Sequence, residues 1–434
     1  MRYLLVGFLL VAGLLVRAQQ APLYFPPIVG DNWETISPDS LGFCPEAIDS
    51  LYSFLGETGT KSFMLLQDGK IVLEKYFGTY TRDSFWYWAS AGKSLTAFLV
   101  GQAKQEGLVH LDSATSTYLG TGWTSCSPEQ EQLITVRHQL SMSTGLDDGV
   151  LDDNCTDPGC LHYLAAPGTR WAYHNAPYHL LHDVLEQATG WSLQQFTKNR
   201  LLDKTGMRGL WINHVQYGRA RDMARFGLLM LAKGRWNGIS LLSDSLYYQA
   251  MIQPSQSMNP SYGYLWWLNS GSTYLVPGVQ LPFVGPLFPA APLDLYAALG
   301  KNDQKIHVVP SKNWVVVRQG TGSNLSLVPI VFDQQLWLRL LELDCGASGV
   351  KENEQEDVVE IFPTVAGSGW WLESASELAG LRLWSGEGKV LWSAQQPMGR
   401  VHFVEVKNWP HGWYVMEVQL LNGRRVLKRV GIGK

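Results

Sequence analysis

The sequence has few charged residues and no strong excess of either sign. Of its 434 residues, 17% are Asp, Glu, Lys or Arg, and the formal net charge is -4. Surfaces that bind nucleic acids are built on clustered positive charge, so we expect no nucleic-acid partner. The hydrophobic fraction of 46% is typical of a globular protein, and a chain of this length can form more than one domain.

Several catalytic and metal-binding patterns are missing as well. The sequence contains neither Cys-x-x-Cys nor His-Glu-x-x-His, so we predict no metal site and no cofactor. It also lacks Gly-x-Ser-x-Gly, the nucleophile elbow of α/β-hydrolases. The pairs Asp147-Asp148 and Asp152-Asp153 do not have the spacing of calcium ligands, and we interpret them as part of a solvated loop.

Long hydrophobic runs are also rare, and the clearest one is at the N-terminus. Met1-Arg2 precedes the apolar stretch from Tyr3 to Val16, and Val16-Arg17-Ala18 resembles a signal-peptide cleavage site. We therefore expect residues 1–18 to be a signal peptide and the protein to be secreted or held at the cell surface. Neither this stretch nor any later one is long enough for a stable membrane span.

Cysteine is scarce, with five residues in the chain. Cysteines of an exported protein can pair, and Cys155 and Cys160 form the best local pair because they flank a turn sequence. The odd number of cysteines leaves at least one thiol free.

The order of the predicted elements indicates an α/β (α+β) domain followed by a smaller all-β module. Strand–turn–strand signals occur at residues 63–73 and 305–318, and the segment between them is mostly helical. An antiparallel sheet built from both ends of the domain, flanked by helices and with a helical subdomain inserted, fits this order. We assign residues 19–345 to this domain, 346–357 to a linker, and 358–434 to a small β-sandwich.

The segment Ser90-Ala91-Gly92-Lys93 contains a candidate nucleophile and base. Residues i and i+3 share one face of a helix, so Lys93 can accept the proton of Ser90 if its surroundings lower its pKa. The helix N-terminus adds free N–H groups near the serine. Because average composition yields about one Ser-x-x-Lys by chance in a chain this long, the pair alone does not identify an enzyme.

A second segment, Tyr173-His174-Asn175, carries residue types that complement this pair. A tyrosine can transfer a proton between the nucleophile and the leaving group, and an asparagine can donate to a substrate carbonyl. We interpret His174, between them, as a packed or loop residue.

Together these segments resemble the penicillin-recognising serine hydrolases, which include class C β-lactamases, D,D-carboxypeptidases and related esterases. The resemblance runs over most of residues 56–343 and includes Ser143-Thr144-Gly145-Leu146 and the aromatic run at 262–267. It implies a β-lactamase/transpeptidase-like fold and four site residues. In this assignment Ser90 is the acylated nucleophile, Lys93 accepts its proton, Tyr173 assists proton transfer and Asn175 contacts the substrate.

The family's third element is Lys-Thr-Gly or His-x-Gly on the strand that lines the cleft. The literal Lys204-Thr205-Gly206 lies just past a helix, where Gly206 is better explained as a helix C-cap. The position that matches the family is 300–304, where Lys301 would supply the cation. The oxyanion site would then use the backbone N–H groups of Ser90 and Gln304. Asp303 stands where the family usually has Gly, and we expect its side chain to narrow the cleft and to disfavour β-lactams.

The C-terminal module resembles the type IX secretion sorting domain of Bacteroidetes. The similar segments are Ile361-Phe362-Pro363, Gly388-Lys389-Val390, residues 409–414 and Lys428-Arg429-Val430. The resemblance implies the secretion machinery as a partner. The alternative is a carbohydrate-binding or adhesive sandwich whose stacking groups are Trp370, Trp371, Trp384 and Trp413.

The sequence thus favours a secreted serine hydrolase of the esterase, amidase or D-amino-acid peptidase type, acting on a small-molecule or peptide substrate through an acyl-enzyme. The alternative from another class is a catalytically silent scaffold of the same fold that binds peptidoglycan fragments or signals. The identity of the substrate does not follow from these patterns.

Overall fold

The computed structural model describes residues 23–322, 330–344 and, within 359–432, all but 363–364, 367–368, 375, 385–389, 396–398, 406–408, 411 and 422–424. The chain forms two compact units, Met1–Ala347 and Ser348–Lys434. Among the described helices, none combines the length and the apolar character that crossing a membrane requires. The predicted signal peptide (1–18) and linker (346–357) lie outside the described residues.

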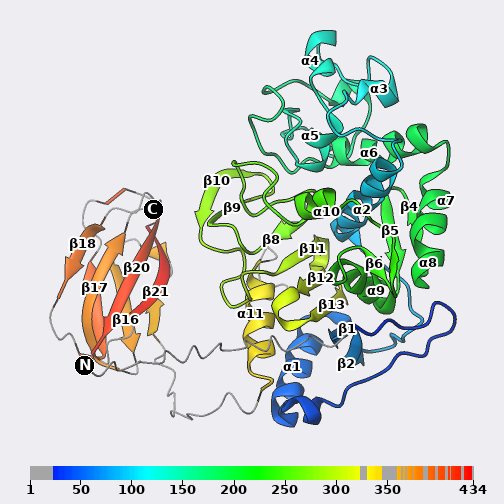
Figure 1. The fold of residues 1–434 in the computed structure, drawn as a ribbon. Coiled ribbons are helices and arrows are strands. Elements are labelled where there is room, and N and C mark those ends of the chain that lie inside the picture. The colour runs from blue at the N-terminus through cyan, green and yellow to red at the C-terminus, as the bar shows by residue number, and fades with distance from the viewer. Residues whose placement is uncertain are drawn as a thin grey trace, which may run out of the picture. The chain divides into compact units, whose positions relative to one another are not determined.

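The first unit is organised around a six-stranded antiparallel sheet with the strand order β2-β1-β13-β12-β11-β8 (Figure 1). β1 and β2 come from the N-terminal part of the unit and the other four strands from its C-terminal part. This confirms the prediction that both ends of the domain build one sheet. The strands are β1 (Thr60–Gln67), β2 (Lys70–Tyr76), β8 (Trp267–Leu268), β11 (Tyr296–Gly300), β12 (Gln304–Val309) and β13 (Trp314–Gly320).

Helices cover both faces of this sheet, so β12 and β13 are buried along their whole length. Side chains alternate along β12. Ile306 faces α9 (Ala220–Leu231) at Gly227, whereas Lys305 and His307 contact Asp333 of α11 (Ile330–Leu341) on the opposite face. α11 also packs against α1 (Pro45–Glu57).

The region between β2 and β8 is mostly helical, as predicted. Its long helices are α2 (Gly92–Gln105), α6 (Asn175–Thr189) and α9. α2 runs through the middle of the unit and is buried for twelve of its 14 residues. The remaining elements are β3 (Trp86–Tyr87), α3 (Ser116–Leu119), α4 (Pro128–Gln132), α5 (Val136–Leu140), α7 (Leu193–Thr197), α8 (Asp203–Thr205), β4 (Leu210–Ile212), β5 (Val215–Gly218), β6 (Arg235–Trp236), β7 (Ile239–Ser240) and α10 (Ser245–Met251).

Two further strands, which the sequence analysis does not predict, form a hairpin between β8 and β11. They are β9 (Thr273–Val276) and β10 (Val279–Val284), paired only with each other. The hairpin stands at the periphery of the first unit, beside β8 (Figure 1).

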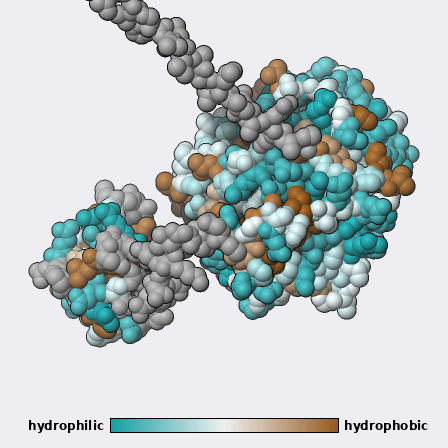
Figure 2. Space-filling model, turned by 60° about the horizontal axis from the view of Figure 1, so that its bottom comes forward, coloured by the Kyte–Doolittle hydropathy of each residue, from teal (hydrophilic) through white to brown (hydrophobic). Residues whose placement is uncertain are grey.

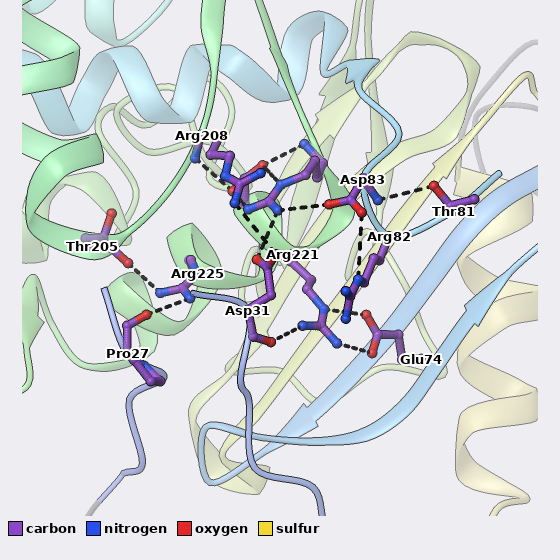
Figure 3. Close-up of polar contacts among 12 residues, drawn as sticks. Pro27, Asp31, Glu74, Thr81, Arg82, Asp83, Thr205, Arg208, Arg221 and Arg225 are labelled. Atoms are coloured by element: carbon purple, nitrogen blue, oxygen red, sulfur yellow. Dashed lines mark hydrogen bonds and ion pairs between the residues drawn. The ribbon is translucent and has the colours of Figure 1, made fainter. Parts of the chain in front are cut away.

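The first described segment of the chain, residues 23–36, is held against this unit by arginines (Figure 3). Arg219 donates to a carboxylate oxygen of Asp31 at 3.2 Å, and Arg221 donates to the Asp31 carbonyl at 2.6 Å. Arg225, which is buried, donates to the carbonyl of Pro27 at 2.9 Å. The segment is therefore an integral part of the folded unit.

The cysteines follow the sequence prediction. Cys155 and Cys160 form a disulfide, and Cys126 is a free thiol. Cys44 is also disulfide-bonded. The loop that contains Cys155 and Cys160 precedes α6, which makes the disulfide relevant to the site described below.

The second unit is a strand-rich module with two sheets, ordered β14-β16-β19 and β15-β21-β20-β17-β18. Residues from both sheets share one hydrophobic core, so the module is a β-sandwich. The strands are β14 (Val359–Phe362), β15 (Val365–Ala366), β16 (Gly369–Ser374), β17 (Leu378–Trp384), β18 (Val390–Ala394), β19 (Val401–Glu405), β20 (Gly412–Leu420) and β21 (Arg425–Ile432).

The tryptophans of this module bear on the alternative of carbohydrate binding. Trp370 is fully buried in the core, so the prediction that it stacks on a sugar is wrong. Trp384 is half-buried and donates to Glu417 at 2.9 Å, whereas Trp371 is exposed. The side chain of Trp413 lies outside the described residues. The four predicted stacking groups therefore do not have the common exposure that a sugar platform needs.

Candidate active site

Ser90 lies in a short 3₁₀ turn, Ala89–Ala91, that leads directly into α2. Ala89 has a φ of 48°, a left-handed conformation that costs a residue with a side chain about 1–3 kcal/mol. The turn tolerates this strain because it is anchored on a buried residue, Trp88, whose N–H donates to the carbonyl of Gln216 at 2.8 Å. The fold therefore holds the residue before the serine in a strained conformation.

Lys93 follows one helical turn later and contacts the serine, as its spacing predicts. Its Nζ donates to Ser90 Oγ at 3.1 Å and to Asn175 Oδ1 at 2.7 Å. The ring centroids of Tyr178 and Tyr173 lie 4.3 Å and 5.1 Å from Nζ. Within the described part of the chain, no carboxylate forms an ion pair with this lysine.

The surroundings of Lys93 change its protonation. The side chain is only 4% exposed. Burial lowers the pKa of Lys93 from 10.5 to about 7, although the negative charge of Asp153 acts in the opposite direction. A lysine with this pKa is neutral in about half of the molecules at pH 7, so it can act as a base toward Ser90.

Tyr173 faces the same serine from the segment before α6. Burial raises the pKa of Tyr173, and a side-chain hydrogen bond with Ser90 opposes this rise. The phenol therefore stays protonated at neutral pH and can donate a proton. Its ring stacks on Trp267 with centroids 5.8 Å apart and meets the edge of Tyr262, which fixes its orientation.

Asn175, the first residue of α6, is held by an acid that the sequence analysis missed. Its Nδ2 donates to Asp153 Oδ2 at 2.8 Å, and the N–H of Ala176 donates to the carbonyl of Asp153, also at 2.8 Å. An amide that donates to Asp153 must turn its oxygen toward Lys93. Asp153 therefore sets the direction of the hydrogen bond between Asn175 and Lys93.

The interpretation of the acidic pairs as a solvated loop is thus wrong for two of the four residues. Asp153 binds Asn175, and Asp148 forms an ion pair with Arg170 at 2.6 Å. Each partner lies 22 residues further along the chain, so no local sequence signal could have identified these contacts. The disulfide between Cys155 and Cys160 closes the same loop two residues after Asp153.

His174 is a packed residue, as expected. It is 2% exposed, and neither ring nitrogen has a hydrogen-bond partner among the described residues. Burial lowers the pKa of His174, which favours the neutral ring despite the neighbouring Asp148, Asp153 and Asp147.

Ser90 and Tyr173 open onto a cavity of about 270 Å³. One side of this cavity is the end of β11, represented by Leu299 and Gly300, followed by Lys301. The other lining residues are Trp267, Val276, Pro277, Leu287 and Ile330.

The strand that lines this cavity is β11, and the predicted third element, residues 300–304, runs from its last residue through the turn to the first residue of β12. β8 pairs with β11 only at Tyr296 and Ala297. The last residues of β11, Leu299 and Gly300, extend past this pairing and line the cavity.

Gly300 packs closely against the turn that carries Ser90. A Cβ at this position would lie 2.3 Å from the carbonyl oxygen of Trp88, so no larger residue fits without a shift.

Lys301 is exposed and lines the cavity with Ser90, in agreement with its predicted position. Gln304 is fully buried and does not line the cavity. Its Nε2 donates to the carbonyls of Gly320, Asn302 and Lys301 at 2.7, 3.0 and 3.2 Å. The side chain thus supports the turn between β11 and β12, and the role of its backbone N–H in an oxyanion site stays a prediction.

The expectation that Asp303 narrows the cleft is wrong. Asp303 is 6% exposed and is not among the residues that line the cavity. Its carboxylate lies 3.3 Å from Lys305 Nζ, in a buried cluster with Asp333. Its negative charge therefore does not bear on substrate selection as the sequence suggested.

The literal Lys204-Thr205-Gly206 lies at the end of α8 and does not line the cavity. Gly206 is the C-cap of this helix, with a φ of 72°, which confirms its interpretation from the sequence. No group of three or more His, Cys, Asp and Glu side chains with the arrangement of a metal site is found among the described residues.

The arrangement combines the three functions that acyl transfer requires. Ser90 supplies a nucleophilic hydroxyl, Lys93 a buried base within hydrogen-bond distance, and Tyr173 a protonated phenol on the same hydroxyl. Lys301 adds a positive charge at the cavity.

Comparisons with known proteins agree with this description. Residues 56–317 match the β-lactamase family. The "Putative penicillin-binding protein PbpX" of Bacillus subtilis (strain 168) is 25% identical over 179 residues, which are 37% of this chain and 43% of that protein. The matched stretch thus spans less than half of that relative.

Solved structures show the same fold. The "Putative 6-aminohexanoate-dimer hydrolase from Bacillus anthracis" has 18% identity and a TM-score of 0.56, covering 71% of this chain and 87% of its own. The octameric penicillin-binding protein homologue from Pyrococcus abyssi has 15% identity and a TM-score of 0.52, covering 90% of this chain and 96% of its own.

Proposed function

Since the chain belongs to the β-lactamase family of serine hydrolases, we propose that it hydrolyses an ester or amide through an acyl-enzyme on Ser90. The observation that carries this proposal is the buried Lys93, with a pKa of about 7, hydrogen-bonded to Ser90 Oγ at 3.1 Å. An exposed lysine would be protonated at pH 7 and could not accept the serine proton.

In the proposed reaction the neutral amine of Lys93 takes the proton from Ser90 as Oγ attacks the substrate carbonyl carbon. The carbonyl electron pair moves onto oxygen, and backbone N–H groups of Ser90 and of the segment 300–304, where the sequence predicts Gln304 for this role, stabilise this oxyanion. The pair then re-forms the carbonyl and expels the leaving group, which takes a proton from Tyr173 or from the ammonium of Lys93. A water molecule, deprotonated by the same groups, attacks the ester and releases the acid and Ser90.

The choice of an esterase or amidase over a β-lactamase rests on the cavity. Apart from Ser90, Tyr173 and Lys301, the described residues that line it are apolar or glycine. The matching proteins include one described as a penicillin-binding protein and one described as a 6-aminohexanoate-dimer hydrolase. Lys301 is suited to hold an anionic group of the substrate at the edge of this cavity.

Covalent labelling with a fluorophosphonate probe tests the proposal. We expect one label per molecule, located on Ser90 by peptide mass spectrometry and absent from Ser90→Ala. The matched control is Ser53→Ala, because Ser53 is exposed on α1. This variant should label like the parent. Well-folded protein that takes up no label and hydrolyses neither aryl esters nor D-alanyl peptides would instead support the silent scaffold.

For the second unit we propose a sorting role in export, together with the N-terminal signal peptide. The support is the pattern of residues 1–18 and the C-terminal segments named above, of which Pro363, Gly388, Lys389 and His411 lie outside the described residues. Deleting residues 358–434 should abolish release to the medium while leaving Ser90 labelling of intracellular protein intact. Unchanged secretion would contradict the assignment.

A further inference from the structure

The walls of the cavity select for the part of the substrate next to the scissile bond, so they bear on the substrate class. The inference about the substrate class rests on the proposed function. Six of the ten described lining residues are apolar, namely Trp267, Val276, Pro277, Leu287, Leu299 and Ile330. Leu287 and Trp267 are buried, at 1% and 7% exposure, so the fold holds these walls in place. Such a surface gains free energy by burying hydrocarbon.

The size of the cavity limits what it can hold. Its volume is about 270 Å³, close to the lower end of the roughly 300–1,000 Å³ found for small-molecule sites. It can therefore enclose the hydrocarbon nearest to the scissile bond but not a large substrate as a whole. The rest of a longer substrate must lie on the surface where the cavity opens.

The β9–β10 hairpin provides an apolar surface at this opening. Val276, the last residue of β9, and Pro277, in the turn, line the cavity. The next strand leaves hydrophobic side chains in solvent: Val284 is 90% exposed and Leu281 74%. Runs of exposed apolar residues on a strand are unusual, because they favour association. On the face drawn in Figure 2, the hydrophobic residues of the first unit lie in small patches within a mostly hydrophilic surface.

The hairpin is fixed beside the reacting groups rather than pointing away from them. Gln280 Nε2 donates to the carbonyl of Trp171 at 3.1 Å, and the Trp171 ring contacts Tyr173. The hairpin is also ordered internally, since the rings of Tyr274 and Phe283 stack with centroids 5.2 Å apart.

Phe283 pairs with Tyr274, two residues before Val276, so Phe283 and Val276 share one face of the hairpin. Val284 pairs with Thr273 on the other face. Apolar side chains on the Val276 face thus extend from the cavity wall to Phe283, which is 43% exposed.

We propose that the substrate is a lipid-like ester or amide. Its hydrocarbon chain begins in the cavity beside Ser90 and continues past Val276 and Pro277 onto the exposed side chain of Phe283 in β10. Val276 and Pro277 belong both to the cavity wall and to the hairpin. This shared segment favours an extended hydrocarbon chain as the occupant, because such a chain can lie along both.

A series of p-nitrophenyl esters, from acetate through butyrate, hexanoate and octanoate to decanoate, tests the proposal on the full chain. The substrates are kept below their critical micelle concentrations. We expect kcat/KM to rise about fourfold for each methylene that becomes buried, the fold-change that corresponds to about 0.8 kcal/mol. The rise should extend beyond the chain length that fills the cavity.

Two variants separate the cavity from the hairpin. Val276→Phe places a larger side chain in the cavity wall and should lower the ratio of decanoate to acetate kcat/KM tenfold or more. Phe283→Ser changes an exposed side chain on the Val276 face and should lower the same ratio several-fold for the longest esters, whereas Val284→Ser, on the other face, should keep it. The matched control is Leu246→Ser, because Leu246 is 81% exposed on α10 and does not line the cavity. This control should keep the ratio of the parent.

The outcomes distinguish this inference from the proposed function. Labelling of Ser90 and hydrolysis of acetate with no rise along the series would overturn the lipid-like substrate and leave the hydrolase intact. Absence of both labelling and hydrolysis would overturn the two together. If Phe283→Ser keeps the parent's ratio but changes the molecular mass measured by light scattering, the hairpin binds another protein copy, and its part in substrate binding is wrong.

Discussion

Two lysines are buried in the described part of the first unit, and they differ in what surrounds them. Lys93 is 4% exposed and Lys305 is 1% exposed. Lys93 lies against a hydroxyl, an amide oxygen and two aromatic rings. Lys305 lies 2.5 Å from the carboxylate of Asp333 and 3.3 Å from that of Asp303. One has neutral partners and the other has two carboxylates.

The difference shows that the partners of a buried amine decide its role more than burial does. Burial disfavours the charged form, and at Lys93 only the more distant Asp153 opposes it, so the lysine can lose its proton. Lys305 belongs to a buried ion-pair cluster in which Asp333 also contacts His307 at 2.8 Å. It therefore connects β12 to α11, while Lys93 is available for chemistry.

The largest expected effect is that of Lys93→Met on activity. Removing the base should lower kcat/KM by roughly 10²- to 10⁴-fold, measured with an aryl ester and scored per folded molecule. The same variant should raise the free energy of unfolding by about 0.5–2 kcal/mol at pH 6. The reason is that below the folded pKa of about 7 the native protein must carry a buried ammonium. A loss of stability at pH 6 would contradict the assignment.

Lys305→Met should instead lower the free energy of unfolding. It removes the buried ammonium that contacts the carboxylate of Asp333, which is fully buried and keeps only His307 as an ion-pair partner among the described residues, and breaking such a pair costs about 3–5 kcal/mol. Urea denaturation measures this loss. Lys312→Met, at an exposed lysine in the next turn, is the control and should change stability by less than about 0.5 kcal/mol. If both variants behave alike, the ion-pair cluster does not stabilise the sheet.

A pH profile sharpens the comparison further. Because the neutral amine of Lys93 is the active form, kcat/KM should rise with pH and reach half of its plateau at about pH 7. Burial raises the pKa of Tyr173, so its phenol should not deprotonate over the same range. An activity that falls as pH rises through 7 would mean that Lys93 acts as an acid.

The smallest expected effect is the shift caused by Asp153→Asn. The carboxylate of Asp153 favours the ammonium form of Lys93, so its removal should move the midpoint of the pH profile to lower pH. Asp157→Asn, at an exposed residue of the same disulfide loop, should leave the midpoint in place. A midpoint that does not move in Asp153→Asn would show that this residue only positions Asn175.

The parts of the site that the sequence predicts are those set by local geometry. Ser90 and Lys93 meet because they are one helical turn apart, and Gly206 caps a helix because its position demands a left-handed residue. The closing hairpin is also local, with the turn at 310–313 joining two runs rich in β-branched residues. Short-range patterns of this kind are sufficient to predict most of the fold.

What the sequence does not predict depends on contacts between distant segments. The strand that lines the cavity, β11, has the small residues Ala297 and Ala298 in place of a β-branched run, so its propensity is weak. The direction of the Asp303 side chain follows from Lys305 and from Asp333, which lies in a separate helix. Asp153 reaches Asn175 only because the intervening loop folds back.

The segment at residues 23–36 has a consequence for the order in which the molecule assembles. Asp31 is bound by Arg219, which lies 188 residues later in the chain. Contacts of such large sequence separation form late, because the loop between them must close first. Tyr24, Trp33 and Ile36 of the same segment bond to residues 68–71, so those parts can dock early on the β1–β2 turn. The contacts of Pro27 and Asp31 cannot form until α9 has been synthesised. We expect residues 27–31 to be the last part of the segment to become protected from proteases during refolding.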